Sequence, residues 1–335
     1  MSLPAGSHSY TTIDAHTVGE PLRIIISGVP AIPGTSILEK RAFAEANLDG
    51  LRRILMWEPR GHADMYGAIL TDPVTPDGDA GVLFLHNDGF STMCGHGVIA
   101  LVTVGVVSGM FGDNVVRLDT PAGRVTATAH VSGGVVESVS FVNVASFVVA
   151  QDLELAVPGL GTITCDIAYG GAFYVYVDAV RLGLELSPAN SERIIDLGRR
   201  IKLAAGAAVE VGHPEGGADL GFLYGTIFVG PPEDPRHHSR NVCVFADGEV
   251  DRSPTGTGVS GRLALHHAKG ELDAGETVEI ESILGTTFSG RIVGSTEVGG
   301  VPAVLPEVTG SAWITGRHEF VVDPKDPLGS GFLLR

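Results

Sequence analysis

The chain has 335 residues, of which 44% are hydrophobic and 18% are charged, and its formal net charge is −17. This composition indicates a compact globular protein long enough for two ordinary domains, and it argues against an intrinsically disordered chain. The acidic balance disfavours nucleic acid and anionic membranes as main partners, because both attract basic surfaces.

The N-terminal half predicts one surface helix, one buried helix and several short strands. Residues 1–10 show no signal-peptide pattern. An amphipathic helix is predicted over residues 37–57, with Ser36 as its N-cap. The apolar stretch 97–107 is too short to span a bilayer, and because it is apolar on all sides it suits a helix inside a domain. Two strand-like runs and a Gly-Gly hairpin signal follow, at residues 115–118, 124–130 and 133–134.

The C-terminal half predicts the same elements in the same order. A surface helix is expected over residues 188–205, with Ser187 as N-cap and Pro188 at the favoured first position. A second glycine-rich loop at residues 255–259 then opens a second helical pattern. Two strand-like runs and a Gly-Gly pair again follow, at residues 277–280, 286–293 and 299–300.

The two glycine-rich loops are the clearest sign of an internal repeat. The first reads Cys94-Gly95-His96-Gly97-Val98 and the second reads Thr255-Gly256-Thr257-Gly258-Val259, and each helical pattern ends in a glycine fifteen residues later, at Gly109 or Gly270. We therefore expect an α+β protein of two pseudo-symmetric domains, each a curved sheet or barrel around a central helix. The polar run 151–154 interrupts a strand pattern, which places the boundary near residues 150–159. The alternative is one α/β domain in which the likeness of the loops is accidental.

A glycine-rich turn that opens a helix presents unpaired backbone N–H groups, which favour a bound anion such as a carboxylate. Two such helix starts facing one cleft would hold a carboxylate from both sides. The same surroundings favour the thiolate of a cysteine, so Cys94 is a candidate base, whereas the second loop offers only the hydroxyl of Thr255. The alternative for Cys94 is an inert buried cysteine.

Metal and cofactor chemistry lack support in the sequence. Cys94 and His96 are separated by one residue, and no further ligands follow at a spacing typical of a metal site. Neither a phosphate-binding loop nor a lysine in a pyridoxal phosphate motif is present. We therefore expect a cofactor-independent activity without a metal. The low, odd number of cysteines indicates a cytoplasmic protein, in which Cys165 and Cys243 are expected to be structural.

Four segments carry a resemblance to the proline racemase family. They are His16-Thr17-Val18-Gly19-Glu20-Pro21, Met93-Cys94-Gly95-His96-Gly97, Tyr169-Gly170-Gly171-Ala172-Phe173-Tyr174, and Asp251-Arg252-Ser253-Pro254-Thr255-Gly256-Thr257-Gly258. The resemblance covers essentially the whole chain after its N-terminal tail. It implies the fold of diaminopimelate epimerase, with an N-terminal domain of residues 10–150 completed by 320–335, and a C-terminal domain of residues 151–319.

The resemblance also implies a reaction. Racemases of this family use two cysteines on opposite sides of the substrate α-carbon; Cys94 matches the first, but the second falls on Thr255. A threonine hydroxyl is far too weak an acid to share proton transfer with a thiol near neutral pH. The Cys/Thr pairing resembles the family's trans-3-hydroxy-L-proline dehydratases, which are hydro-lyases of hydroxyproline catabolism that eliminate water to form pyrroline-2-carboxylate.

The remaining roles follow from the same match. The backbone N–H groups of the two loops are expected to bind the substrate carboxylate, Asp251 and the His96 side chain to hold the ring nitrogen, and Phe245 to pack against the ring; the N–H groups are those of Gly95, His96, Gly256 and Thr257. Simpler interpretations exist for two of these residues and for Thr255: a turn for Asp251, ordinary core for Phe245 and a small polar spacer for Thr255.

Two other functions remain open at this point. One is a proline racemase or a 4-hydroxyproline 2-epimerase that uses a water held by Thr255 as its second acid. The other is an imino-acid-binding protein without catalysis. In each case the partner is a small imino acid, and neither nucleic acid nor a membrane is expected; the sequence leaves the oligomeric state open, with a homodimer among the expected assemblies.

Overall fold

The computed structural model describes residues 6–334, which form two compact units. The described part of unit 1 comprises residues 6–92, 97–139 and 311–334, and unit 2 comprises residues 93–96 and 140–310. The assignment of two domains with boundaries near residues 150 and 320 stays a prediction. Among residues 6–334, no helix combines the length and the apolar character needed to cross a membrane.

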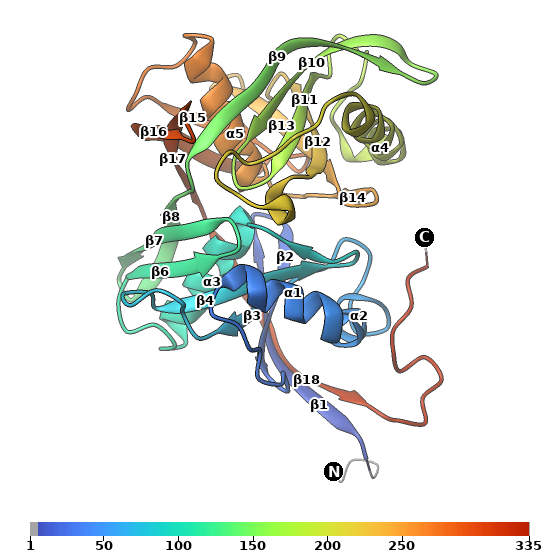
Figure 1. Cartoon of the computed structure of the whole chain (residues 1–335). Helices are drawn as coiled ribbons and strands as arrows, with labels where there is room; N and C mark the ends of the chain where they lie inside the picture. The colour runs from blue at the N-terminus through green and yellow to red at the C-terminus, as the bar shows by residue number, and fades with distance from the viewer. Residues whose placement is uncertain (1–5, 335) are drawn as a thin grey trace. The chain divides into compact units, whose positions relative to one another are not determined.

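Unit 1 contains a sheet in which β1 pairs antiparallel with both β18 and β2, and β2 then pairs parallel with β3 (Figure 1). The sheet continues through β4, which pairs antiparallel with β3 and β5 and parallel with β6, and through β6, which pairs antiparallel with β7. The strands of this unit are β1 (His8–Thr17), β2 (Glu20–Ser27), β3 (Tyr66–Thr71), β4 (Ala80–His86), β5 (Phe90–Ser91), β6 (Val115–Thr120), β7 (Gly123–Ser132) and β18 (Ala312–Val322). A further strand, β8 (Val135–Val142), runs across the change of unit after residue 139.

The predicted surface helix of unit 1 is two helices, α1 (Ile37–Asn47) and α2 (Asp49–Met56). Its start is confirmed, because the Ser36 hydroxyl accepts a hydrogen bond from the Glu39 amide and forms a capping box. The expected single helix to residue 57 is wrong. Leu48 between the helices is non-helical and buried, and its neighbours include Asp49 and Gly50, which have low helix propensity.

The predicted buried helix is α3 (Gly95–Val107), whose residues 98–102 are fully buried. It ends as the sequence predicts, because Gly109 adopts a positive φ of 73° just beyond the helix. The strand-like runs that follow are confirmed as β6 and β7, and residues 133 and 134 join β7 to β8 with positive φ angles of 58° and 82°.

Unit 2 is a closed barrel. The pairing runs β9–β10–β11–β12–β13–β15–β16–β17, and β17 returns to β9 through Ala303 opposite Phe147. The strands are β9 (Ser146–Val157), β10 (Gly161–Tyr169), β11 (Phe173–Asp178), β12 (Leu223–Gly230), β13 (Ser239–Phe245), β14 (Glu249–Val250), β15 (Thr277–Glu281), β16 (Thr287–Val298) and β17 (Val301–Gly310). The short β14 pairs with the end of β13.

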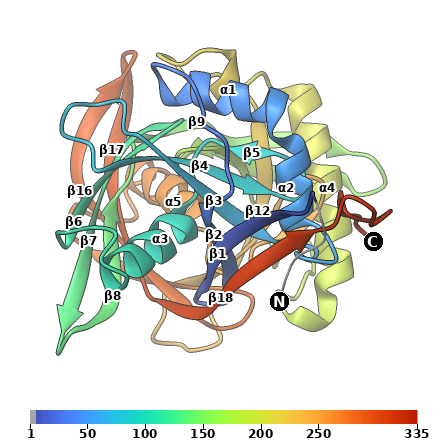
Figure 2. The same cartoon turned by 90° about the horizontal axis from the view of Figure 1, so that it is seen from below.

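Two helices complete unit 2. α5 (Gly256–Ala268) is buried over its first ten residues and contacts β9, β10, β16 and β17; Figure 2 shows it beside β9, β16 and β17. α4 (Ser191–Ala208) packs on the outside of the barrel, where its apolar face forms a core with β9 to β13. The predicted start at Pro188 is a short 3₁₀ turn (Pro188–Asn190) that leads into α4, and a second such turn spans Ala218–Leu220.

The polar run 151–154 does not interrupt a strand, contrary to expectation. β9 continues through it and pairs with β10 up to Val157 opposite Gly161. Residues 151, 152 and 154 are exposed, whereas Leu153 packs against the core of unit 2. The β9–β10 register shifts at this point, where Asp152 has a positive φ of 50°.

The repeat that the loops indicate extends to the whole topology of each unit. In unit 1 the pairings of β1 to β7 follow the order antiparallel, parallel, antiparallel, a short antiparallel hairpin, parallel and antiparallel. Strands β10 to β16 of unit 2 follow the same order. The helix α3 lies between β5 and β6, and α5 lies at the equivalent place between β14 and β15.

Candidate functional site

The starts of α3 and α5 contact each other through two glycines. A Cβ atom on Gly95 would lie 2.7 Å from the Gly256 Cα, and one on Gly256 would lie 2.9 Å from the Gly95 Cα. Such a Cβ atom would also lie 3.1 Å (Gly95) or 3.2 Å (Gly256) from Cζ of Phe141. Because no side chain fits at either position, the sequence must place glycine after Cys94 and after Thr255. The structure thus brings the two predicted loops together, and residues 93–96 and 251–258 all belong to unit 2.

Cys94 immediately precedes α3 and is 4% exposed. Its Sγ lies 3.3 Å from Nδ1 of His96, which is equally buried. The thiol therefore meets an imidazole and the N-terminal end of a helix, and both favour a negatively charged sulfur. This surrounding differs from that of Cys165 in β10, where burial and the neighbouring Asp166 raise the pKa of the thiol to about 11.

Thr255 caps α5 in an unusual backbone conformation, with φ of 66° and ψ of 94°. A β-branched residue rarely adopts a positive φ, and such a conformation costs about 1–3 kcal/mol. Its hydroxyl is buried and makes no hydrogen bond of regular geometry within residues 6–334. Backbone strain at the position facing the Cys94 loop is typical of a functional site.

Asp251 lies at the start of the second loop and is 4% exposed. Its Oδ1 accepts a 2.7 Å hydrogen bond from the Ser253 amide, so the residue does form the turn that the simpler interpretation expects. Burial raises the pKa of its carboxyl to about 6, against the opposing effect of the Ser253 and Thr255 hydroxyls. A buried carboxylate that is ionised near neutral pH suits a cationic ring nitrogen as its partner.

The first turn of α5 is held by side chains that the sequence analysis did not select. The hydroxyls of Tyr174 and Thr257 lie 2.8 Å apart, and the Tyr176 hydroxyl donates to the Gly258 carbonyl at 2.9 Å. Tyr174 belongs to one of the segments that carried the family resemblance, whereas Tyr176 stood out by no pattern.

A second set of hydrogen bonds connects the same turn to the segment after β8. The Asn143 amide donates to the Ser260 hydroxyl at 2.9 Å, and that hydroxyl donates to the Gly256 carbonyl at 2.9 Å. Asn143 also donates to the Gly170 carbonyl at 2.7 Å. These bonds fix the direction of the amide groups at the start of α5, which leaves them available for an anion.

Phe245 ends β13 and is 3% exposed. Its ring stacks on that of Tyr224, with centroids 5.4 Å apart and an angle of 23° between the planes. This packing agrees with the core interpretation, and a contact between Phe245 and a substrate ring stays a prediction.

Similarity to known proteins agrees with this arrangement. The chain is 52% identical over 334 residues to a trans-3-hydroxy-L-proline dehydratase of Colwellia psychrerythraea, covering 98% of this chain and 94% of that protein. It is 49% identical over 333 residues to a 3-hydroxyproline 2-epimerase of Burkholderia multivorans, covering 98% and 99%.

A crystal structure of a hydroxyproline epimerase from Agrobacterium vitis, with bound trans-4-hydroxy-L-proline, superposes with a TM-score of 0.92 at 34% identity, over 98% of this chain and 95% of that one. This likeness confirms the predicted fold class. The family model for proline racemase matches residues 12–333. The chain belongs to the proline racemase family.

Proposed function

We propose that this chain is a hydro-lyase that converts trans-3-hydroxy-L-proline to pyrroline-2-carboxylate and water. The observation that carries the proposal is the pairing of Cys94 with Thr255 at two helix starts that meet through Gly95 and Gly256. A relative that is 52% identical over nearly the whole chain carries the name of this activity. The reaction belongs to hydroxyproline metabolism.

The stereochemistry of the substrate explains why one thiol suffices. In trans-3-hydroxy-L-proline the hydroxyl lies opposite the carboxylate, and the α-hydrogen also lies opposite the carboxylate. Both leaving groups are therefore on the same face of the ring. A single group on that face can remove the proton and then protonate the departing hydroxide.

In the proposed mechanism the Cys94 thiolate removes the α-proton. The electron pair of the Cα–H bond forms the Cα–Cβ double bond, the C–O bond at Cβ breaks, and the Cys94 thiol gives its proton to the leaving hydroxide as water. The thiolate is thereby restored, and the enamine product tautomerises to the cyclic imine. Protons and electrons balance between the substrate and Cys94, so the reaction is cofactor-independent.

The two helix starts would bind the substrate carboxylate through the N–H groups of Gly95, His96, Gly256 and Thr257. Hydrogen bonds to the carboxylate strengthen as the carbanion delocalises into it, so they stabilise the transition state more than the ground state. The Asp251 carboxylate and the His96 imidazole would hold the ring nitrogen in its cationic form, which makes the α-hydrogen more acidic. The Phe245 ring would pack against the pyrrolidine.

Thr255 would determine the outcome because its side chain is not acidic enough to donate a proton. Its hydroxyl cannot deliver a proton to the opposite face of Cα near neutral pH, so the deprotonated ring eliminates water instead of inverting. Specificity then comes from removing the group that the competing reaction needs.

Incubation of the purified protein with trans-3-hydroxy-L-proline tests the proposal, with the imine measured as its aminobenzaldehyde adduct. We expect imine from the parent protein, none from Cys94→Ser, and unchanged production from Cys165→Ala, which removes a buried thiol in β10. Absence of imine above the level of Cys94→Ser would refute the dehydratase.

A second candidate, 2-epimerisation of 3-hydroxyproline, is favoured by the name of the Burkholderia multivorans relative. Chiral chromatography of the same reaction separates the two activities. An epimer of the substrate without imine would establish the second candidate, and proline or trans-4-hydroxy-L-proline as substrate would test racemisation and 4-hydroxyproline 2-epimerisation. A homodimer and a cytoplasmic location stay predictions.

A further inference from the structure

Arg262 lies in the middle of α5 and is buried, with 5% of its surface exposed. Within residues 6–334 the hydrogen bonds of its guanidinium go to neutral acceptors. Nη1 donates to Ser239 Oγ at 2.7 Å and to Asn241 Oδ1 at 2.9 Å, and Nη2 donates to His266 Nε2 at 3.0 Å. Burial lowers the pKa of Arg262 to about 10, so the group stays cationic at neutral pH. A buried cation without a directly bonded carboxylate is costly.

Asn241 connects this guanidinium to the loop that precedes α5. Its side chain is fully buried in β13, and Nδ2 donates to the Pro254 carbonyl at 3.2 Å. Because a guanidinium can only donate, it requires the carbonyl oxygen of the Asn241 amide on its own side. The amide nitrogen must then face Pro254. Arg262 thus selects which of the two orientations the Asn241 amide adopts.

The carbonyl that Asn241 holds belongs to the peptide group between Pro254 and Thr255. The N–H of the same peptide donates to the Ser253 hydroxyl at 3.1 Å, so the peptide is fixed at both ends. Thr255 next to it has the positive φ of 66°. A strained conformation persists only where surrounding contacts over-determine it, and these two hydrogen bonds are such contacts.

We propose that Arg262 is a positioning residue of this enzyme: through Asn241 it holds the Pro254–Thr255 peptide, and thereby keeps Thr255 and the first amides of α5 in the geometry that the reaction needs. The inference rests on the proposed function. Arg262 acts on the substrate only through this loop, and it lies seven residues along the helix from Thr255.

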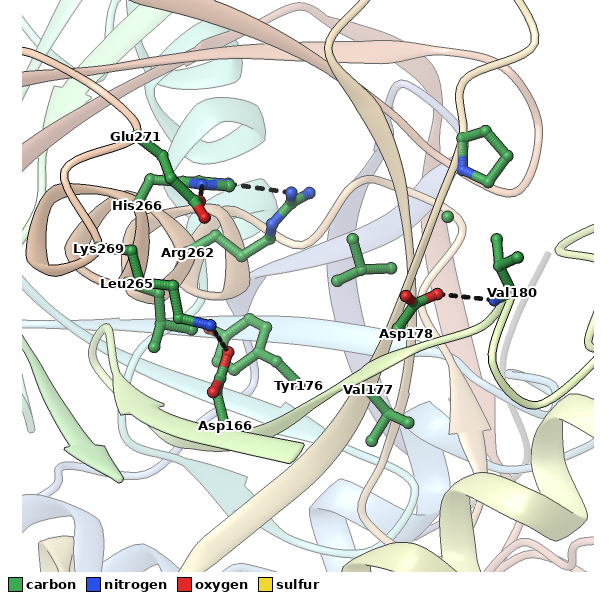
Figure 3. A pocket seen from close by; sticks show the side chains of 13 residues that line it. Asp166, Tyr176, Val177, Asp178, Val180, Arg262, Leu265, His266, Lys269 and Glu271 are labelled. Atoms are coloured by element: carbon green, nitrogen blue, oxygen red, sulfur yellow. Dashed lines mark hydrogen bonds and ion pairs between the residues drawn. The ribbon is translucent and has the colours of Figure 1, made fainter. Parts of the chain in front are cut away.

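The other side of the guanidinium borders a surface cavity of about 500 Å³ (Figure 3). Figure 3 shows His266 between Arg262 and Glu271. His266 Nδ1 lies 2.6 Å from Glu271 Oε2, and burial together with the Arg262 charge lowers the pKa of His266 to about 4. The neutral ring donates from Nδ1 to Glu271 and accepts at Nε2 from Arg262, so it orients the guanidinium from outside. The cavity also gives small solutes access to this position.

Two conservative variants test the hydrogen bonds that link Arg262 through Asn241 to the Pro254 carbonyl. Arg262→Lys keeps the charge but loses the planar fork, and Asn241→Asp keeps a partner for Arg262 but loses the donor to Pro254. Lys269→Gln is the matched control, because Lys269 follows the end of the same helix and lines the same cavity but pairs with Asp166, away from the loop. We expect kcat/KM for trans-3-hydroxy-L-proline to fall about 10- to 100-fold in both variants and to stay at the parent value in Lys269→Gln.

A double-mutant cycle separates positioning from general loss of stability. If Arg262 acts through Asn241, the double variant should lose no more kcat/KM than the worse single variant. Losses that multiply would overturn the inference, as would parent-like kcat/KM in both single variants. Measurement of the melting temperature beside each rate shows whether the loss follows unfolding, and a rate that recovers fully at a temperature where the variant is folded would also contradict it.

A chemical rescue experiment can supply a guanidinium ion through the cavity that Arg262 lines. An Arg262→Ala variant should regain activity with millimolar guanidinium chloride, in a saturable manner, and should not respond to urea or potassium chloride. Equal recovery with urea, or no recovery in a folded variant, would contradict the role of a cation with this shape.

Hydrogen exchange keeps this inference separate from the proposed function. In Arg262→Lys the backbone amides of the segment 253–257 should exchange their hydrogens faster than in the parent protein. In Lys269→Gln the exchange rate of this segment should stay at the parent value. If the parent protein makes no imine, the proposed function fails while the exchange result still decides whether Arg262 holds the loop. Unchanged exchange in Arg262→Lys would show that it does not.

Discussion

Replacing Asp251 by asparagine should make the protein more stable and less active at neutral pH. Burial raises the pKa of this carboxyl from its ordinary 3.8 to about 6. Between these values the folded protein binds more protons than the unfolded chain, so stability falls as the pH rises and stays reduced above pH 6. At about 1.4 kcal/mol for each pH unit, the charged carboxylate costs about 3 kcal/mol at about pH 7.5 and about half of that at about pH 5.

The asparagine side chain of the Asp251→Asn variant would be neutral at every pH, so it would avoid this cost while its Oδ1 still accepts from the Ser253 amide. The advantage of Asp251→Asn over the parent should therefore decrease by about 1–2 kcal/mol between about pH 7.5 and about pH 5. This change with pH is the decisive quantity, because any cost of burying the extra amide donors is the same at both pH values and cancels.

Urea unfolding followed by far-ultraviolet circular dichroism measures this difference. Tryptophan fluorescence would report on the wrong part of the molecule, because Trp57 and Trp313 both belong to unit 1 and Asp251 belongs to unit 2. An advantage for Asp251→Asn that is equal at both pH values would show that Asp251 has an ordinary pKa and would refute the reasoning. Loss of imine formation in the stabilised variant would show that the buried charge serves function at the expense of stability.

Three further substitutions test the site. Gly95→Ala would place a Cβ 2.7 Å from a backbone atom of the facing loop. Calorimetry should therefore show a free energy of unfolding lower by about 1–3 kcal/mol, and imine formation should be lost. In the control Gly50→Ala the new Cβ meets nothing within 4 Å, so stability should stay the same or rise. Tyr174→Phe would leave the Thr257 hydroxyl without its 2.8 Å contact. If the first turn of α5 binds the carboxylate as proposed, steady-state kinetics should show a rise in KM larger than the fall in kcat, and an unchanged KM would contradict that role. Thr255→Cys should add α-epimerisation, detected by chiral chromatography; a folded variant without it would mean that pocket shape also separates the two reactions.

The elements that the sequence predicts well are those with a strong local signal. Gly109 and Gly270 end the two buried helices with positive φ angles of 73° and 68°, which few other residues adopt without strain. The paired loops were equally visible, because close approach of two backbones demands glycine. Local chemistry of this kind specifies both where the elements end and where the candidate site lies.

Predictions failed where a break leaves no mark in the hydrophobic pattern or where polarity has more than one cause. The single helix expected over residues 37–57 breaks at Leu48, yet the buried residues 44, 48, 51 and 55 keep the spacing of one helix face across the break. The polar run 151–154 suggested a boundary, but it marks a register shift of the β9–β10 pairing, where Asp152 has a positive φ and the neighbouring side chains 151 and 152 are both exposed. The contact of Arg262 with Asn241 joins residues 21 apart in the chain, and no periodicity reveals such a pair.

The duplicated topology explains why a single position can decide the reaction. Both copies of the motif provide a helix start and glycine amides, so in the proposed reaction the carboxylate would be bound by groups that the backbone supplies and that substitution of side chains does not remove. The reacting groups occupy the residue before each helix, where Cys94 and Thr255 differ. In the proposed reaction, binding is therefore shared by the two copies while proton transfer belongs to one. Because Thr255 keeps its hydroxyl buried and its φ positive, the second copy retains the shape of a reactive position without the acidity, and Arg262 and Asn241 hold that shape from behind.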